Sequence, residues 1–174
     1  MRDKLLKIKT LVFDVDGVFT DGLILALPDG DLLRQFDAKD SFSIRMASMN
    51  GLRPAVITGG SSVSILKRCQ FIGIAEEDVF LHSRDKLADF QKYCQKYGYA
   101  PDEVLYCGDD LPDIPVMMHC FGVAPADAVE EVKQAASYVS ASGGGRGFIR
   151  NTVEMVMKVQ GKWDFNVETY KKMF

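Results

Sequence analysis

The chain has 174 residues, 47% of them hydrophobic, a composition that suits one compact domain with a real core. Its net charge of -3 gives no basic field that would favour nucleic acid, and no apolar run reaches the roughly 18 residues of a membrane span. The N-terminus has no apolar signal-like core, so we expect a cytoplasmic protein. The four cysteines lie too far apart for a zinc or redox motif, and we expect buried thiols.

The first half of the chain predicts two buried strands separated by a hairpin and a helix. Residues 9–15 are β-branched and aromatic and end at Gly17, which is typical of a strand. A β-hairpin is expected over 22–37, where LILAL and LLRQFD flank the turn sequence PDG. A helix follows over 41–50, with Gly51 as its C-cap. RPAVIT predicts the second strand, and GGSS begins a helix that runs to about residue 70.

The second half continues the alternation of strand and helix. DVFLH predicts a third strand, residues 84–97 a helix, and EVLYCG a fourth strand. A short helix in DDLPDIPVMMH, a fifth strand in FGVAP, a helix over 127–136 and a short strand in SYVSA follow. SGGGRG is typical of a mobile loop, 148–160 predicts a last helix, and a tail covers 161–174. This alternation predicts a single α/β domain over 1–174, a doubly wound parallel sheet of the Rossmann type in a three-layer sandwich.

Polar residues follow four separate strands of the predicted sheet. In such sheets ligands bind beyond the carboxyl ends of the strands. The residues expected at that edge are Asp14 and Asp16 at the end of the first strand, Thr58 at the end of the second, Lys86 at the start of the helix after the third, and Asp109 and Asp110 at the end of the fourth. Side chains two positions apart in a strand share a face, so the first two acids can point into one crevice.

The residue types gathered at this edge indicate phosphoryl transfer. Converging carboxylates repel one another, and their oxygens are the ligands that Mg²⁺ prefers. Lys86 supplies a second positive charge, and Thr58 beside the amides of a helix start suits a phosphate. A metal, a cation and an anion cradle beside a nucleophilic carboxylate fit this chemistry.

Each part of the pattern also has a purely structural explanation. An acid at a strand end is often a cap or turn residue, and Asp21 is explained equally well in that way. GDD and TGG are each common turn sequences when taken alone. The whole ordered set, with each member after a different strand, favours a catalytic site.

These residues resemble the motifs of the haloacid dehalogenase superfamily of phosphotransferases. FDVDGVFTDG resembles the first motif, ITGG the second, Lys86 the third and GDDLPD the fourth, in order over nearly the whole chain. The resemblance implies that Asp14 is the nucleophile and forms an aspartyl-phosphate, and that Asp16 is the general acid and then the general base.

The same resemblance implies a set of supporting residues. Asp14, the backbone carbonyl of Asp16, and Asp109 would hold Mg²⁺. Asp110 and Asp113 would support this metal site from outside, and Thr58 and Lys86 would grip the phosphoryl group.

Members of the superfamily often carry a cap domain, for which this chain has no room beyond the hairpin flap at 22–37. DVDGVFTDG, the hairpin, FDAKDSFSI and GGRG resemble the capless phosphatases of 3-deoxy-D-manno-octulosonate 8-phosphate, in the lipopolysaccharide sugar pathway. The alternatives are a phosphatase of nine-carbon keto-acid sugar phosphates, a phosphomutase and a non-catalytic partner domain. The chain has Gly60 where that group commonly has Arg, and KDS at 39–41 where it has RDG, which leaves the exact sugar open.

The resemblance also implies a sugar-acid substrate and a homotetramer. The cations expected to meet the substrate carboxylate are Arg68 and Arg146, and Gly59 and Lys39 are the other residues expected to contact the substrate. LILAL is apolar at every position, which favours burial of the hairpin against other subunits. The tail residues expected to dock on a neighbouring subunit are Trp163, Phe165, Tyr170 and Phe174.

Overall fold

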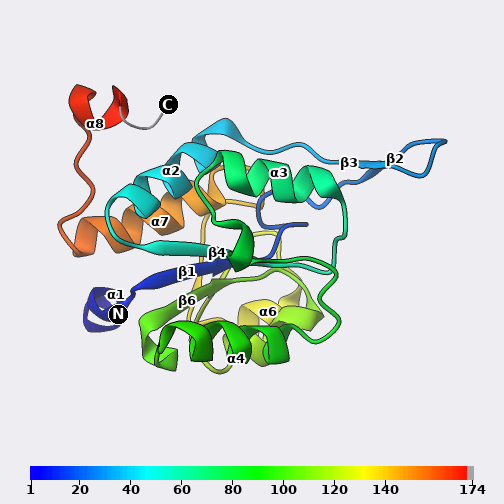
Figure 1. Cartoon of the computed structure of the whole chain (residues 1–174). Helices are drawn as coiled ribbons and strands as arrows, with labels where there is room; N and C mark the ends of the chain where they lie inside the picture. Colours follow the sequence, from blue (N-terminus) through cyan, green and yellow to red (C-terminus); the bar gives the residue numbers. More distant parts are fainter. Residues whose placement is uncertain (172–174) are drawn as a thin grey trace.

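A six-stranded parallel sheet forms the centre of the molecule, in the order β5-β4-β1-β6-β7-β8 (Figure 1). The computed structural model describes residues 1–171, without the side chains of residues 169 and 170. The strands are β1 (Thr10–Phe13), β4 (Arg53–Ile57), β5 (Val79–Phe80), β6 (Val104–Cys107), β7 (Phe121–Ala124) and β8 (Tyr138–Val139). The predicted doubly wound α/β fold without a separate cap domain is confirmed.

Helices cover both faces of the sheet. One face carries α2 (Ala38–Met49), α3 (Val63–Phe71) and α7 (Phe148–Val159), and the other carries α4 (Lys86–Tyr97), α5 (Ile114–Met117) and α6 (Glu130–Ala135). The remaining helices are α1 (Arg2–Lys7), α8 (Val167–Lys171) and the 3-10 turns η1 (Glu76–Asp78), η2 (Pro101–Glu103) and η3 (Leu111–Asp113). Across residues 1–171, no helix has the length and apolar character needed to cross a membrane.

The alternation of side chains along β1 shows how one short strand serves two cores. Leu11 and Phe13 belong to the apolar cluster under α2 and α7, whereas Val12 belongs to the cluster under α4 and α6. Because both faces are buried, the strand continues from Thr10 as the apolar run Leu11–Phe13, as in other parallel sheets.

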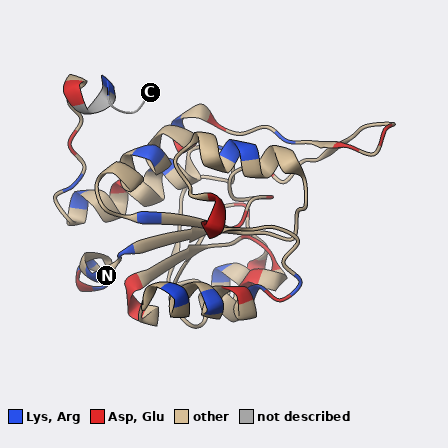
Figure 2. Ribbon diagram, in the orientation of Figure 1, with Lys and Arg blue, Asp and Glu red and all other residues tan. Residues whose placement is uncertain are grey.

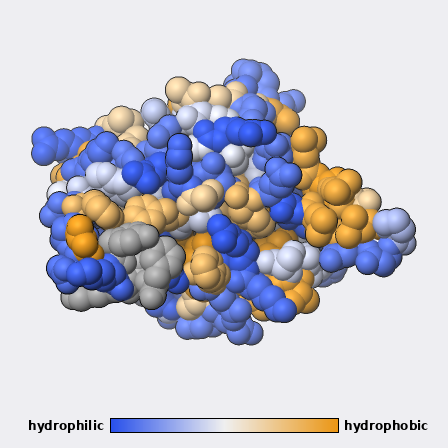
Figure 3. Space-filling model, turned by 90° about the horizontal axis from the view of Figure 1, so that it is seen from above, coloured by the Kyte–Doolittle hydropathy of each residue, from blue (hydrophilic) through white to orange (hydrophobic). Residues whose placement is uncertain are grey.

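The hairpin projects away from the body of the molecule (Figure 1). It consists of β2 (Leu25–Ala26) paired antiparallel with β3 (Leu32–Leu33), which is shorter than the predicted pairing of LILAL with LLRQFD. Figure 3 shows an apolar stem and a hydrophilic tip. The exposed apolar residues of this hairpin are Leu23, Ile24, Leu25, Leu32 and Leu33, which we call the hairpin patch.

The loop SGGGRG, for which the sequence predicted mobility, makes specific backbone contacts in the structure. Gly144 donates its N–H to Asp127 Oδ1 at 3.0 Å, and Gly145 donates to Val18 O at 3.1 Å. A Cβ on Gly144 would lie 1.8 Å from Gly17 O, so only glycine allows this approach to the loop after β1. The glycines therefore serve close packing, and the loop is tied to the segment that follows the central strand.

The start of one helix and the presence of another also differ from the sequence predictions. α2 begins at Ala38, three residues earlier than predicted, because the carboxylate of Asp37 caps it by accepting the N–H groups of Lys39 and Asp40. α1 was not predicted, and its one buried residue is Leu5, which gives too weak a periodic signal over six residues.

The strand order places the crevice of the fold beside β1. From β1 the chain moves through β4 to β5 on one side, and then through β6, β7 and β8 on the other. The direction of winding reverses at β1, and ligands of such sheets bind at this switch point beyond the carboxyl ends of the strands. Figure 2 shows acidic residues in the loops at that edge of the sheet.

Candidate active site

A cavity of about 690 Å³ opens at the carboxyl edge of the sheet. Seven of the residues predicted from the sequence line it: Asp14, Asp16, Thr58, Gly59, Lys86, Asp109 and Asp110. They come from the loops after β1, β4 and β6 and from the start of α4, so the fold brings together residues that are far apart in the chain.

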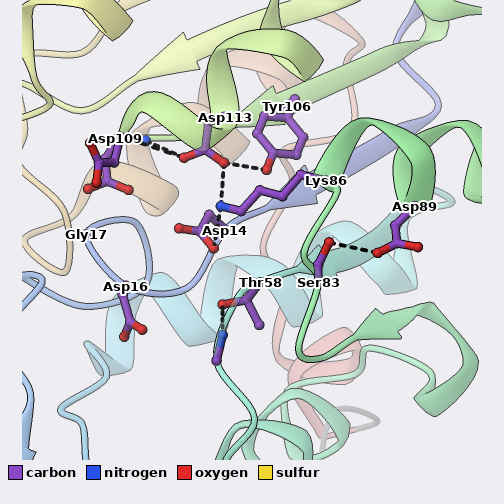
Figure 4. Close-up of polar contacts among 12 residues, drawn as sticks. Asp14, Asp16, Gly17, Thr58, Ser83, Lys86, Asp89, Tyr106, Asp109 and Asp113 are labelled. Atoms are coloured by element: carbon purple, nitrogen blue, oxygen red, sulfur yellow. Dashed lines mark hydrogen bonds and ion pairs between the residues drawn. The ribbon is translucent and has the colours of Figure 1, made fainter.

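Lys86 is buried at the start of α4 and bridges two carboxylates. Its Nζ lies 3.1 Å from Asp14 Oδ1 and 2.6 Å from Asp113 Oδ1. Burial lowers the pKa of Lys86, but the two carboxylates outweigh this and raise the pKa above its usual value. The ammonium group is therefore charged and held beside Asp14, which is 6% exposed (Figure 4).

The fully buried carboxylate of Asp113 holds several groups of this part of the site in place. Its Oδ1 accepts hydrogen bonds from Lys86 Nζ and from the Tyr106 hydroxyl, both at 2.6 Å. Its Oδ2 accepts the backbone N–H groups of Asp109 at 3.1 Å and of Asp110 at 3.3 Å (Figure 4). One buried carboxylate thus fixes both the cation and the segment after β6. Asp110 itself accepts the N–H of Leu111 and caps η3.

The carboxylates of Asp14, Asp109 and Asp113 fit a divalent cation. Each offers an oxygen within 4.8 Å of the others. Asp113 already accepts four hydrogen bonds, whereas Asp109 Oδ1 is buried and has no hydrogen-bond partner among the described residues. Burial, and then the neighbouring carboxylates, raises the pKa of Asp14 to about 7 and that of Asp109 to about 8. A hard cation with oxygen ligands, such as Mg²⁺, would relieve this crowding.

Gly17 explains how Asp109 approaches the loop after β1. A Cβ at this position would lie 2.0 Å from Asp109 Oδ2, and the backbone has a φ of +82°. Both features require glycine. The glycine of the DVDG sequence therefore lets the acids of two strands meet.

Thr58 follows β4 at the wall of the cavity. Its side chain is buried, and its Oγ1 accepts the N–H of Gly60 at 3.2 Å. Its backbone carbonyl accepts the N–H of Ser83 at 2.9 Å, which joins the loop after β4 to the loop before α4. A hydroxyl fixed in this way can contact an anion in the cavity.

Asp16 has a partner that the sequence analysis missed. Arg34, from the end of the hairpin, places Nε 2.6 Å from Asp16 Oδ1 and Nη2 3.0 Å from Asp16 Oδ2. The Arg34 side chain is only 3% exposed. Its signal in the sequence was that it is the only basic residue between positions 22 and 37.

Comparison with known proteins identifies the family. Residues 70–148 match the model of the haloacid dehalogenase-like hydrolases. Over 158 residues the chain is 37% identical to the 3-deoxy-D-manno-octulosonate 8-phosphate phosphatase of Escherichia coli strain K12, covering 90% of this chain and 83% of the relative. The chain belongs to this phosphatase family.

Two solved structures have the same fold as this member of the octulosonate phosphatase family. The Yersinia pestis enzyme of the same name superposes with a TM-score of 0.89 at 33% identity, covering 92% of this chain and 86% of that chain. The Moraxella catarrhalis enzyme, solved in complex with a magnesium ion, a phosphate ion and a KDO molecule, gives a TM-score of 0.91 at 28% identity, covering 97% of both chains.

In this octulosonate phosphatase family member, the residues predicted to contact the substrate lie in different places. Gly59 lines the cavity, whereas Arg68, Arg146 and Lys39 do not. Arg68 donates to Ser41 Oγ at 2.7 Å and lines a separate cavity between α2 and α3. Arg146 pairs with Asp21 at 3.0 Å, next to a segment that reaches the cavity rim at Gly22.

Arg84 is a cavity cation that the sequence analysis did not identify. It lines the same cavity as Asp14, and it pairs with no carboxylate among residues 1–171. Its Nη2 lies 3.3 Å from His82 Nδ1. Its place two residues before Lys86 was the available sequence signal.

The tail aromatics that the structure describes pack on their own chain. Trp163 packs against the core and lies under the guanidinium of Arg150, 4.6 Å from ring centroid to Cζ. The ring of Phe165 lies 6.3 Å from that of Phe42. The Tyr170 side chain and Phe174 lie outside the described residues, so their predicted contact with a neighbouring subunit stays a prediction.

Proposed function

We propose that this chain is a Mg²⁺-dependent phosphatase that converts 3-deoxy-D-manno-octulosonate 8-phosphate to 3-deoxy-D-manno-octulosonate and phosphate, a step of lipopolysaccharide biosynthesis in the cytoplasm. The observation that carries the proposal is the buried Asp14, held beside Lys86 and Asp109 in one cavity with Asp16. The 37% identity to a phosphatase of that substrate supports the choice of sugar.

The first half of the reaction transfers the phosphoryl group to Asp14. A carboxylate oxygen of Asp14 attacks phosphorus, and the bond from phosphorus to the sugar oxygen breaks. Asp16 donates its proton to the departing oxygen, so a neutral alcohol leaves. The product of this half is an aspartyl-phosphate on Asp14.

The second half returns the enzyme to its starting state. Asp16, now a carboxylate, takes a proton from water, and the water oxygen attacks phosphorus. The bond between phosphorus and Asp14 breaks, which releases inorganic phosphate and the Asp14 carboxylate. One acid beside the nucleophile thus serves both halves in turn.

The surrounding residues stabilise the charge that develops on phosphorus. Lys86 and the hydroxyl of Thr58 contact the phosphoryl oxygens, and the hydrogen bonds of Asp113 keep Lys86 in place. Asp14, Asp109 and the backbone carbonyl of Asp16 would hold the metal, with Asp110 and Asp113 as its supporting residues. When bound, Mg²⁺ supplies positive charge that neutralises phosphoryl oxygens and opposes the repulsion among the acids.

The carboxylate at the far end of the sugar acid needs a cation outside the reaction centre. Arg84 lines the cavity without a carboxylate partner, and Arg146 extends from the glycine loop with its side chain 72% exposed. Arg84 is the better supported of the two because it lines the cavity itself, whereas Arg146 pairs with Asp21 outside the cavity lining.

We extend the proposal to a homotetramer assembled through the hairpin. The hairpin patch exposes five large aliphatic side chains on a two-stranded element that is unstable alone. Contiguous apolar surface of this kind marks an interaction site, and copies of one chain associate in closed symmetric groups.

The experiment that tests the function is release of phosphate from a panel of substrates. The panel holds the eight-carbon sugar-acid phosphate, a nine-carbon sugar-acid 9-phosphate, a neutral sugar phosphate and an aryl phosphate, each with Mg²⁺ and with a chelator. We expect the highest kcat/KM for the eight-carbon substrate and no turnover under chelation. A higher kcat/KM for the nine-carbon acid would reassign the substrate, and full turnover under chelation would contradict the metal dependence.

A further inference from the structure

We propose that Arg34 is the positioning residue for Asp16: its guanidinium grips both carboxylate oxygens and fixes the proton-transfer group of the reaction from the hairpin. This role rests on the proposed function of Asp16 as general acid and base. Apart from Gly22 at its base, no described residue of the hairpin lines the cavity, so the inference connects the flap to the chemistry.

The geometry of the pair is that of a bidentate ion pair. Nε of Arg34 lies 2.6 Å from Asp16 Oδ1, and Nη2 lies 3.0 Å from Asp16 Oδ2. The two N–H groups on one edge of the planar guanidinium thus each donate to one oxygen of the carboxylate. Asp16 raises the pKa of Arg34 further, so the guanidinium keeps its charge. Lysine, as a point charge, cannot fix both oxygens in one orientation.

Burial shows that the contact is built into the structure. The Arg34 side chain is 3% exposed although its neighbours in the hairpin face solvent. Asp16 is 28% exposed, and within residues 1–171 Arg34 is the only side chain that donates to its carboxylate. Without Arg34 the Asp16 side chain would be free to take other rotamers in an open cavity.

Gly60 lies next to the guanidinium of Arg34. A Cβ on Gly60 would lie 3.4 Å from Arg34 Nη2 and 3.5 Å from Thr58 Oγ1. The sequence analysis noted Gly60 as a departure, because the resembling group commonly has Arg there. In this chain the guanidinium next to position 60 comes instead from the hairpin, through Arg34.

A residue that positions the general acid can be recognised from how its loss changes kcat/KM for substrates with different leaving groups. Protonation by Asp16 matters most when the leaving oxygen is strongly basic, as in phenyl phosphate, and least when it is weakly basic, as in p-nitrophenyl phosphate. Loss of Arg34 should therefore lower kcat/KM for phenyl phosphate much more than for p-nitrophenyl phosphate. A residue that only holds the fold together would affect both substrates alike.

The test compares Arg34→Gln, Arg34→Lys and the control Arg45→Gln with the wild type, in Mg²⁺, on both aryl phosphates. Arg45 donates to Phe71 O on α3 and does not line the site cavity. We expect Arg34→Gln to lower the ratio of phenyl to p-nitrophenyl kcat/KM by about tenfold or more, with Arg34→Lys intermediate and Arg45→Gln unchanged. Thermal unfolding is measured for each variant, and the Lys variant provides the comparison if the Gln variant does not fold.

A second arm separates positioning from direct binding of the substrate. In an Asp16→Asn background, Arg34→Gln should change kcat/KM by less than about twofold, because the group that it positions is already lost. Equal losses on both substrates, or a full further loss in the Asp16→Asn background, would overturn the proposal. Absence of phosphate release by the wild type from the eight-carbon sugar-acid phosphate would instead overturn the proposed function itself, and this role with it.

Discussion

Asp14 and Asp109 couple the chemistry of the site to pH. Their pKa values in the folded state, about 7 and about 8, lie above the roughly 3.9 of an unfolded aspartate. Between about pH 4 and pH 8 the metal-free folded state therefore binds more protons than the unfolded state. These two groups therefore favour folding at low pH, and their contribution is lost as the pH rises from about 4 to about 8.

The prediction is that metal-free protein becomes less stable between about pH 6 and pH 8, and that Mg²⁺ binds more tightly over the same range because it displaces protons. Thermal unfolding at each pH and calorimetric titration with Mg²⁺ check it. Asp109→Asn is the matched variant, and its metal-free stability should depend less on pH. Metal-free stability that rises over this range in the wild type, or pH-independent Mg²⁺ affinity, would contradict the assignment.

The second prediction at the residue scale concerns the roles of Arg84 and Arg146 in binding the substrate. If Arg84 meets the substrate carboxylate, Arg84→Gln should raise KM for the sugar-acid phosphate by about tenfold and leave KM for an aryl phosphate nearly unchanged. Arg146→Gln should have the smaller effect, because Arg146 lies outside the cavity lining and pairs with Asp21. Steady-state kinetics on both substrates decide this, and equal effects on the two would count against a carboxylate contact.

The sequence correctly predicted the cavity residues that lie at the ends of strands. Asp14, Thr58 and Asp109 were placed at one edge because parallel strands end there together. Arg34 could not be found in this way, since its contact with Asp16 depends on how a hairpin folds back over the cavity. No local pattern encodes such a tertiary contact.

At the scale of elements, the glycine loop at 142–147 supports the loop after β1. The sequence analysis inferred that this loop is mobile from its high glycine content. Glycine content shows that side chains are absent, but it does not show which close backbone contacts their absence allows. Gly144 illustrates the difference, because its lack of a side chain lets the two loops touch. The alternation of strands and helices, by contrast, determined the sheet and both helical layers from the sequence.

This packing yields a prediction for Gly144→Ala. The added Cβ would meet Gly17 O at 1.8 Å and displace the loop that carries Asp16, so we expect a loss of about 1–3 kcal/mol in unfolding free energy together with a lower kcat. Gly161→Ala is the control, because it has a positive φ but open space around it, and it should lose stability without losing kcat. Denaturant unfolding and steady-state kinetics measure both effects, and unchanged kcat in Gly144→Ala would show that the loop does not support the site.

At the scale of the whole molecule, the hairpin patch is the feature left unexplained by a single chain (Figure 3). We expect light scattering to give a tetramer at micromolar concentration for the wild type. Leu25→Asp should give smaller species, because Leu25 is 62% exposed at the centre of the patch. The control is Leu6→Asp on α1, where Leu6 is 50% exposed, and it should stay tetrameric. A wild-type monomer with full activity would rule out the assembly.

The central claim is that Asp14 is the nucleophile of a Mg²⁺-dependent phosphatase. The most direct measurement is phosphate release from 3-deoxy-D-manno-octulosonate 8-phosphate by the wild type and by Asp14→Asn, with mass spectrometry to exclude deamidation and thermal unfolding to confirm the fold. Asparagine keeps the shape of the side chain but removes the attacking charge, so turnover should fall by about a thousandfold or more. Phosphate release at the wild-type rate from a folded, undeamidated Asp14→Asn protein would contradict the account.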